Sequence, residues 1–244
     1  MQVFVLDNTF ISSPSPENDD GKQNEETMNV IMPFEFDREY FVEQLGDIPR
    51  KPIYSFFKRL ADIVFSFLLI SLLFVPMVFI GIVVKFTSKG SVLYFQERLG
   101  LGGRKFKIIK FRTMDRNAEE NGAQWSEGDD DERITKFGRF LRKTRLDELP
   151  QLWCIFIGTM SFVGPRPERE CFCIAFEKYV HGFSERLKVK PGLTGLAQIN
   201  GGYDLRPEEK VIYDVEYIKK RSLWLDLKIV FGTFAVVFHR KGAK

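Results

Sequence analysis

An uncharged apolar segment, residues 63–84, limits what this chain can fold into more than any other feature of its sequence. The segment reads IVFSFLLISLLFVPMVFIGIVV. As one straight α-helix its 22 residues would be about 33 Å long, enough to cross the hydrocarbon core of a membrane. Pro76 lies inside the segment. Because proline removes a backbone donor and clashes with the preceding turn, we expect the helix to kink or break there.

Basic residues flank the apolar segment on both sides: Lys51, Lys58 and Arg59 precede it, and Lys85 and Lys89 follow it. Positive charge prefers the cytoplasmic face of a membrane, so these flanks are compatible with both ends lying on one side. We therefore predict a re-entrant helix-break-helix that dips into one leaflet and returns. A kinked single span is the alternative, because spanning helices tolerate proline.

The net charge of +3 conceals an uneven distribution of charge along the chain. Residues 1–50 carry eleven acidic side chains and three basic ones, whereas residues 51–244 carry 33 basic and 22 acidic ones, a net charge of +11. A basic body beside an apolar segment suggests anionic lipid head groups, phosphorylated substrates or both as partners. Nucleic acid would also suit a basic surface, but the apolar segment argues against it, and we expect no nucleic-acid partner.

The order of local patterns after the apolar segment predicts an α+β fold that is mainly helical. Residues 92–95 and 106–111 are rich in aromatic and branched side chains, and the glycine-rich stretch 100–103 lies between them. This pattern indicates a small β-hairpin. The remaining chain is expected to form amphipathic helices, some at the membrane interface, around a compact domain.

Four helices are expected in the second half of the chain, one of them beginning near the acidic pair described below. Thr135 can cap a helix with an apolar stripe at Phe137, Phe140 and Leu141. Pro207 is suited to open a helix that runs to about residue 221. Residues 222–238 are apolar and aromatic, which is typical of an interfacial helix, although a buried core helix would read similarly.

Asp147 and Glu148 form an acidic pair inside the basic run RFLRKTRLDELPQ, residues 139–151. An acidic pair by itself is typical of solvated surface. Pro150 is tolerated only in a first helical turn, so a helix is expected to begin near Asp147, where free amides and the helix dipole favour anions. Its apolar face would use Leu149, Leu152, Trp153 and Phe156. Two carboxylates among arginines can stay ionised at neutral pH, where one can attack phosphorus and the other can hold a divalent metal.

Other candidate binding elements follow the acidic pair. Prolines on both sides of Arg166 predict a stiff bend that holds its guanidinium in place, suited to clamp a phosphate; an ordinary surface turn is the alternative. Residues 191–195, PGLTG, read as a turn-rich loop with free backbone donors. With only His181 and His239 in the chain, histidine metal sites and Ser-His-Asp triads are poor candidates.

Five motifs occur in order behind the apolar segment: Phe95-Gln96-Glu97-Arg98, Lys110-Phe111-Arg112-Thr113-Met114, Arg145-Leu146-Asp147-Glu148-Leu149-Pro150-Gln151, Gly164-Pro165-Arg166-Pro167 and Pro191-Gly192-Leu193-Thr194-Gly195. Together they resemble the bacterial sugar transferase family, the monotopic polyprenyl-phosphate phosphoglycosyl transferases. The resemblance covers residues 58–202 and extends more loosely to residue 239. Many relatives have serine before the proline that interrupts the membrane helix, whereas this chain has Val75.

The resemblance implies an enzyme that transfers a sugar 1-phosphate from a nucleotide diphosphate sugar, usually a UDP-sugar, to undecaprenyl phosphate and releases UMP. Such a reaction initiates assembly of a bacterial surface glycan such as exopolysaccharide, capsule or O-antigen. By this resemblance Asp147 is the nucleophile that carries a covalent phosphosugar, and Glu148 helps to place Mg²⁺. Candidate phosphate contacts are Arg98, Arg112, Arg145 and Arg166.

The same resemblance suggests how the chain is divided and where it resides. Residues 1–50 are expected to form an acidic, largely flexible tail, residues 51–89 the re-entrant membrane helix, and residues 90–244 a catalytic domain with interfacial helices. The expected location is the cytoplasmic face of the bacterial inner membrane, in contact with anionic lipids. The sequence leaves open whether the chain forms a homo-oligomer.

Three alternatives remain at this point. A metal-dependent nucleotide-sugar glycosyltransferase would use Asp129 and Asp131 as its metal-binding pair, but the chain lacks the strand-helix alternation of a nucleotide-binding sheet. A one-step transferase would use Asp147 as a base. A non-catalytic membrane adaptor would need neither carboxylate. The sequence does not identify the sugar.

Overall fold

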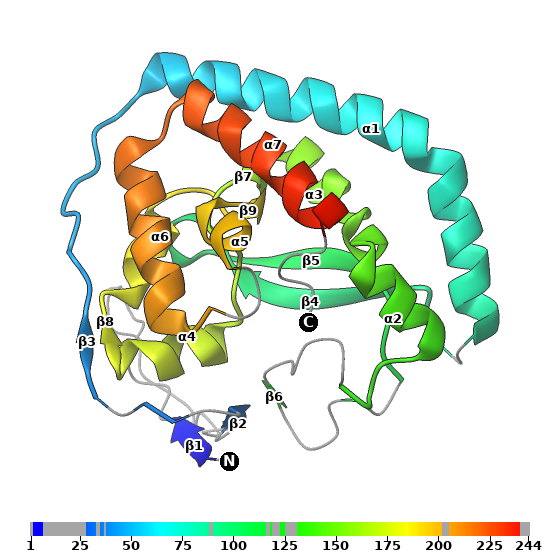
Figure 1. The fold of residues 1–244 in the computed structure, drawn as a ribbon, viewed down its shortest axis with the longest axis horizontal. Helices are drawn as coiled ribbons and strands as arrows, with labels where there is room; N and C mark the ends of the chain where they lie inside the picture. The colour runs from blue at the N-terminus through cyan, green and yellow to red at the C-terminus, as the bar shows by residue number, and fades with distance from the viewer. Residues whose placement is uncertain are drawn as a thin grey trace, which may run out of the picture.

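The computed structural model describes residues 2–6, 28–32, 35–36, 38–87, 90–115, 118, 123–124, 131–201 and 205–239. The helices are α1 (Pro52–Thr87), α2 (Lys136–Lys143), α3 (Gln151–Ile157), α4 (Glu170–Glu177), α5 (Leu196–Asn200), α6 (Pro207–Lys220) and α7 (Leu223–His239). The strands are β1 (Gln2–Leu6), β2 (Met28–Met32), β3 (Tyr40–Phe41), β4 (Leu93–Leu99), β5 (Lys105–Phe111), β6 (Ala123–Gln124), β7 (Ser161–Val163), β8 (Val180–His181) and β9 (Gly192–Thr194). The predicted mainly helical fold with few strands is confirmed, and Figure 1 shows α1 and α7 along one side of the molecule.

Helix α1 contains the whole apolar segment and is long and apolar enough to cross a membrane. It continues through Pro76, so the proline does not end the helix, although Figure 1 shows the helix bending in the half that contains it. The exposed side chains of α1 include Ile53, Phe56, Phe65, Leu72, Phe79 and Phe86. An apolar surface of this extent is typical of contact with lipid.

The opposite face of α1 packs on the domain along the length of the helix. Leu69 and Leu73 pack against the buried cluster that contains Ile155 of α3. Further along, Ile80 and Val84 are themselves buried in a cluster with residues of β5 and α2. The helix is therefore a structural part of the domain as well as its apolar surface.

Arg59 of α1 joins this helix to the end of α3. Its two terminal nitrogens donate to the carbonyl oxygens of Ile155 and Phe156, each at 2.7 Å. The last carbonyls of a helix lack the usual partners within the helix, and the guanidinium supplies donors to two of them; Ile155 also accepts from the backbone nitrogen of Gly158. Gly158, with φ 93°, ends α3, and a Cβ there would lie 2.9 Å from the Arg59 guanidinium.

Strands β4 and β5 pair antiparallel in the register Leu93↔Phe111 to Leu99↔Lys105, which confirms the predicted hairpin. Leu99, Ile108 and Phe111 of the hairpin are buried in the core clusters. The hairpin therefore carries Lys110 and Arg112, at the end of β5, toward the centre of the molecule.

The predicted loop at residues 191–195 is instead strand β9, which pairs parallel with β7. Glycines make this pairing close: a Cβ on Gly192 would lie 2.1 Å from the nitrogen of Gly164, and one on Gly195 would lie 2.2 Å from the Gly164 oxygen. The turn-like composition therefore reflects the need for two backbones to approach each other, a use of glycine that resembles a loop in the sequence.

The acidic tail is described in part, since residues 7–27 lie outside the described residues. Strand β1 pairs antiparallel with β2, so segments at both ends of this gap form strands. Strand β3 runs parallel to β8, and the Phe36 ring stacks on Tyr179 with 4.8 Å between ring centroids. The end of the tail thus docks on the same domain that follows α1.

The predicted helices of the second half are present as α2, α6 and α7. Thr135 caps α2, accepting a hydrogen bond from the backbone nitrogen of Gly138 at 3.0 Å, as expected. One detail of the predicted stripes is wrong: Leu141 is fully buried, but Phe140 is 53% exposed. Trp153 of α3, assigned to an apolar inner face, is likewise exposed. Both rings extend the apolar exterior instead of the core.

A polar cluster anchors α7 to α1 and α6. Asp226 Oδ2 accepts hydrogen bonds from Lys58 Nζ at 2.8 Å and from the Tyr54 hydroxyl at 2.9 Å. Its other oxygen accepts from the Tyr217 hydroxyl at 2.9 Å. Asp226 is mostly buried, so its charge relies on these three partners.

Asp226→Asn is expected to lower the melting temperature in detergent by about 5–10 °C, because it leaves Lys58 charged and without a carboxylate in a mostly buried place. Thermal unfolding of the purified protein measures this. The matched control is Glu216→Gln, which removes an exposed ion pair with Lys220 and is expected to shift the melting temperature by less than about 2 °C. Equal shifts in the two variants would contradict the assigned anchoring role.

Candidate active site

The acidic pair lies between α2 and α3 in a turn with an uncommon backbone conformation. Arg145 has φ 59° and ψ 14°, the left-handed region, and is the one non-glycine residue with positive φ in the described part of the chain. A single 3₁₀ turn, Leu146–Glu148, follows, and α3 begins only at Gln151. The sequence predicted that the pair would open this helix. In the structure the pair precedes the helix instead. Such strain outside glycine is typical of functional sites.

Asp147 is a buried carboxylate with unused hydrogen-bonding capacity. It is 5% exposed, and its Oδ1 has no hydrogen-bond partner among the residues that the structure describes. Burial, helped by the neighbouring charge of Glu148, raises the pKa of Asp147 to about 6. Lys110, Arg142 and Arg145 oppose that rise. The carboxylate is thus mostly ionised at pH 7 but more basic than an ordinary aspartate, which suits a nucleophile.

Glu148, the next residue, has the opposite environment. It accepts a hydrogen bond from a terminal nitrogen of Arg166 and another from Lys110 Nζ at 3.1 Å. Burial alone would raise its pKa, but the charges of Arg166, Lys110 and Arg145 hold the pKa of Glu148 well below its usual range. Two adjacent carboxylates therefore differ in basicity, which separates their chemical roles.

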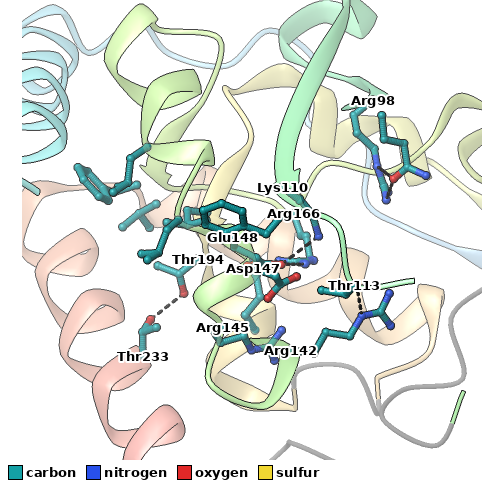
Figure 2. A pocket seen from close by; sticks show the side chains of 18 of the residues that line it. Arg98, Lys110, Thr113, Arg142, Arg145, Asp147, Glu148, Arg166, Thr194 and Thr233 are labelled. Carbon is teal, nitrogen blue, oxygen red and sulfur yellow. Dashed lines mark hydrogen bonds and ion pairs between the residues drawn. The ribbon is translucent and has the colours of Figure 1, made fainter. Parts of the chain in front are cut away.

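Arg166 lies between two prolines, and its backbone is held from two sides. Arg186 donates to the Arg166 carbonyl at 2.8 Å, and Arg98 donates to the Pro167 carbonyl at 3.1 Å. The bend therefore presents the Arg166 guanidinium to Glu148, as Figure 2 shows. In the structure, a carboxylate is one partner of the guanidinium that the predicted bend carries.

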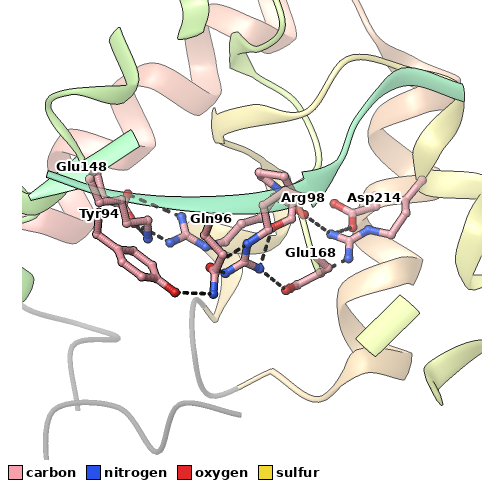
Figure 3. A network of polar contacts seen from close by, with 10 residues as sticks. Tyr94, Gln96, Arg98, Glu148, Glu168 and Asp214 are labelled. Atoms are coloured by element: carbon pink, nitrogen blue, oxygen red, sulfur yellow. Dashed lines mark hydrogen bonds and ion pairs between the residues drawn. The ribbon is translucent and has the colours of Figure 1, made fainter. Parts of the chain in front are cut away.

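Arg98 was predicted as a phosphate contact, and the structure gives it protein partners. It donates to Gln96 Oε1 from two nitrogens, at 2.5 and 3.0 Å, and to Glu168 Oε2 at 3.2 Å. Figure 3 shows Glu168 near Asp214. Asp214 is buried and forms an ion pair with Arg186 at 2.8 Å. Arg98 therefore supports the Arg166 bend, whether or not it also contacts a phosphate.

The buried acids Glu168 and Asp214 and their partner Arg186 were not predicted from the sequence. Each reads as an ordinary charged residue in a polar stretch. One signal was present: Glu168 directly follows Pro167, so a side chain there is held by the same stiff bend. The partners come from distant parts of the chain, which no local pattern indicates.

All the predicted site residues line one cavity of about 1380 Å³. Asp147, Glu148 and the four predicted arginines, Arg98, Arg112, Arg145 and Arg166, lie on its polar part. The structure adds Lys110, Arg142 and Thr113 to this wall, with Arg142 Nε donating to the Thr113 hydroxyl at 3.0 Å. Figure 2 shows the labelled cations around Asp147 and Glu148. The cavity is therefore suited to an anion with several phosphate charges.

The same cavity has an apolar wall between α1 and α7. Phe65, Leu69 and Leu73 of α1 line it, as do Leu227 and Val230 of α7. In Figure 2 the hydroxyls of Thr194 and Thr233 meet between the acidic pair and α7, 2.7 Å apart. The cavity thus joins a cationic region that contains two carboxylates to an apolar region formed by α1 and α7.

The acidic pair of Asp147 and Glu148 can contribute at most two carboxylates to a metal ion. No group of three or more acidic, histidine or cysteine side chains that could hold a metal occurs in the described part of the chain. A Mg²⁺ ion commonly takes one or two protein carboxylates and completes its shell with phosphates and water, so the unpartnered Asp147 oxygen and Glu148 fit an ion that arrives with a diphosphate.

The rival metal pair of Asp129 and Asp131 is described only in part. Asp131 is already paired with Arg133, whose Nε lies 2.7 Å from Asp131 Oδ1. Asp129 lies outside the described residues.

Comparison with known proteins gives a consistent set of relatives. The N-acetylgalactosaminephosphotransferase of Aeromonas hydrophila that uses UDP-N-acetylgalactosamine and undecaprenyl phosphate is 40% identical over 204 residues, 82% of this chain and 48% of that protein. A UDP-glucose:undecaprenyl-phosphate glucose-1-phosphate transferase of Klebsiella pneumoniae is 42% identical over 208 residues, 83% of this chain and 44% of that protein. A transferase of the same name from Caulobacter vibrioides is 40% identical over 197 residues, 77% of this chain and 72% of that protein.

The chain spans about half the length of the first two of these relatives. The family model described as bacterial sugar transferase matches residues 53–240, which include α1, the acidic pair, the Arg166 bend and α7. By this match and by these identities, the chain belongs to the bacterial sugar transferase family.

Proposed function

We propose that this protein transfers a sugar 1-phosphate from a UDP-sugar to undecaprenyl phosphate, releases UMP and so initiates assembly of a bacterial surface glycan. The observation that carries the proposal is one cavity whose wall contains Asp147, with an Oδ1 that has no partner among the described residues, together with several cations and an apolar surface of α1 and α7. Relatives that are 40 and 42% identical bear names that state this chemistry.

The proposed reaction has two displacements at one phosphorus atom. An oxygen of Asp147 attacks the phosphorus that bears the sugar; the bond from that phosphorus to the bridging oxygen breaks, and UMP leaves with the oxygen. An oxygen of the lipid phosphate then attacks the same phosphorus, and the bond to Asp147 breaks. Asp147 returns as a carboxylate and the lipid carries the diphosphate sugar.

The remaining residues of the site have electrostatic roles in this proposal. Arg166 and Lys110 hold Glu148 ionised and oriented, and Arg112, Arg142 and Arg145 surround the space that the diphosphate would occupy. Glu148 would hold Mg²⁺ through a carboxylate oxygen. Bound Mg²⁺ would neutralise charge on the diphosphate as UMP departs.

Release of UMP from a panel of UDP-sugars, with and without undecaprenyl phosphate, tests the proposal. With a labelled UDP-sugar and no lipid, label is expected on Asp147 together with up to one equivalent of UMP. UMP release that occurs only with lipid present, without labelled protein, would favour one-step transfer with Asp147 as base. No UMP release from any UDP-sugar under either condition would leave the adaptor alternative.

The rate of transfer is expected to rise from pH 5 to pH 7 and then level off. Because the pKa of Asp147 is raised to about 6, the protonated and unreactive acid dominates below that pH and the carboxylate above it. Glu148 is ionised throughout this range, since its pKa is held low. Initial rates of UMP release at fixed ionic strength measure the profile; a rate that stays flat down to pH 5 would contradict the assignment.

We also propose that α1 is re-entrant and that the protein lies on the cytoplasmic face of the inner membrane. Contacts on both sides of the apolar segment support this. Before it, Lys51 Nζ donates to the Arg221 carbonyl at 2.8 Å, and Arg221 donates to the Pro49 carbonyl at 2.6 Å. After it, Leu93 pairs with Phe111 in the hairpin of the same domain. A helix that crossed the bilayer would hold these two sets of contacts on opposite sides.

Labelling in sealed vesicles tests this topology. Gln44 precedes α1 and Asn200 follows it, both are exposed, and the three native cysteines are buried. The single variants Gln44→Cys and Asn200→Cys are expected to react with a membrane-impermeant maleimide from the same side of the membrane. Reaction from opposite sides would show that the segment spans the membrane.

A further inference from the structure

Gln198 has a buried side-chain amide that the fold itself does not use. It lies on α5, immediately after β9. Neither its Nε2 nor its Oε1 has a hydrogen-bond partner among the residues that the structure describes, although both atoms are buried. The amide can be turned either way without changing this result. An unpaired buried amide typically costs about 1–3 kcal/mol, so its presence calls for an explanation.

Gln198 belongs to the wall of the cavity that the proposed reaction uses. Gln198 lines the same cavity as Asp147 and Glu148. A Cβ on Gly195 would lie 2.7 Å from Gln198 Oε1 and 2.2 Å from the Gly164 oxygen, so the amide lies close to the backbone that leads into the Arg166 bend. Thr194, whose hydroxyl is engaged with Thr233, also lines this part of the cavity.

The chemistry of an amide restricts which part of the substrates it can serve. Phosphate oxygens accept hydrogen bonds but donate none at neutral pH, and the cations of the site already suit them. A polyprenyl chain has neither donors nor acceptors. A sugar presents hydroxyl groups, or an acylamino group, that both donate and accept, and the uracil and ribose of the nucleotide do so too. Of these groups the sugar is the one attached to the phosphorus next to Asp147 in the proposed reaction.

We propose that Gln198 is a specificity-determining residue that hydrogen-bonds the sugar of the donor substrate. This inference rests on the proposed function and deepens it, because it assigns a residue to the sugar, which the sequence left without one. The unpaired donor and acceptor have almost no accessible surface in the ligand-free fold, and they become available to the sugar when the side chain turns toward the cavity.

The test replaces Gln198 with methionine, which has similar length and no amide. For the preferred UDP-sugar, kcat/KM is expected to fall about tenfold, the loss of two hydrogen bonds, and discrimination against other UDP-sugars should shrink by a similar factor. The affinity for UDP, which lacks the sugar, and the KM for undecaprenyl phosphate should stay within about twofold of the wild type. The melting temperature should be unchanged or higher, because an unpaired buried amide is removed.

Two further variants make the result specific. Gln198→Asn keeps the amide but withdraws it by one methylene and should show the same loss of discrimination. Gln44→Met is the matched control, since Gln44 is exposed and outside the cavity, and it should behave as the wild type.

The other outcomes would overturn the inference. If Gln198→Met leaves the kcat/KM values for the different UDP-sugars unchanged, the amide does not contact the sugar. A parallel fall in UDP affinity would assign the amide to the nucleobase, and a change confined to the lipid KM would assign it to the acceptor. An inactive wild-type protein would instead count against the proposed function, so the two failures are distinguishable.

Discussion

Asp147→Asn is expected to reduce transfer by about 10³-fold or more while the protein stays folded. The amide cannot form the bond to phosphorus that the carboxylate forms, and no other carboxylate of the described cavity wall combines a raised pKa with a fully buried oxygen that has no hydrogen-bond partner. UMP release measures the rate, and labelled UDP-sugar should leave no label on the variant. The matched control is Asp47→Asn, which changes an exposed carboxylate outside the cavity and should keep full activity.

The same substitution is expected to stabilise the fold at pH 7. The pKa of Asp147 is raised in the folded protein, so its contribution to stability is fully present below the pKa of the unfolded chain and is lost as pH rises through about 6. Asparagine carries no charge and avoids that loss. The free energy of unfolding at pH 7 is therefore expected to rise by an amount on the order of 1–3 kcal/mol. Thermal unfolding should therefore show a higher melting temperature for Asp147→Asn, with the difference shrinking as pH falls toward 4.

Loss of activity together with loss of stability would contradict this account, because it would make Asp147 a structural residue. Retained activity would remove the nucleophile assignment altogether. The combination of lost activity and gained stability is expected only of a carboxylate whose burial serves a reaction.

Arg166→Ala is expected to reduce transfer by about 100-fold or more. Arg166 is the leading source of the low pKa of Glu148, and its removal leaves that buried carboxylate with Lys110 as its remaining hydrogen-bond donor in the described structure. Pro165 and Pro167 should keep the bend itself, since they restrict the backbone independently of the side chain. UMP release at saturating substrates measures the effect.

Two variants accompany this substitution. Arg166→Lys keeps the charge but loses the planar fork, and an intermediate rate is expected. Arg104→Ala removes an exposed arginine outside the cavity and should retain wild-type activity. If Arg166→Ala stays within about threefold of the wild type, Arg166 is a surface cation without a role in the reaction.

The local elements of the fold could be predicted because each depends on neighbouring residues. The apolar segment became α1, the aromatic runs around a glycine turn became β4 and β5, and Thr135 capped α2. The pairing of β7 with β9 could not be predicted, because the glycines that permit it look like a loop in one dimension. The exposed Phe140 was misplaced for a related reason: near a membrane, an apolar ring need not face the core.

The candidate site, like the fold, could be predicted only in part. The sequence by itself determined which groups were available: two adjacent carboxylates, several arginines, a stiff Pro-Arg-Pro bend and an apolar helix. Only the tertiary structure decided that Asp147 is the more basic acid and Glu148 the paired one, and that Gln198 has an unused amide. Basicity and hydrogen-bond satisfaction depend on burial and on charges that approach through space from distant parts of the chain, and these quantities exist only once the chain is folded.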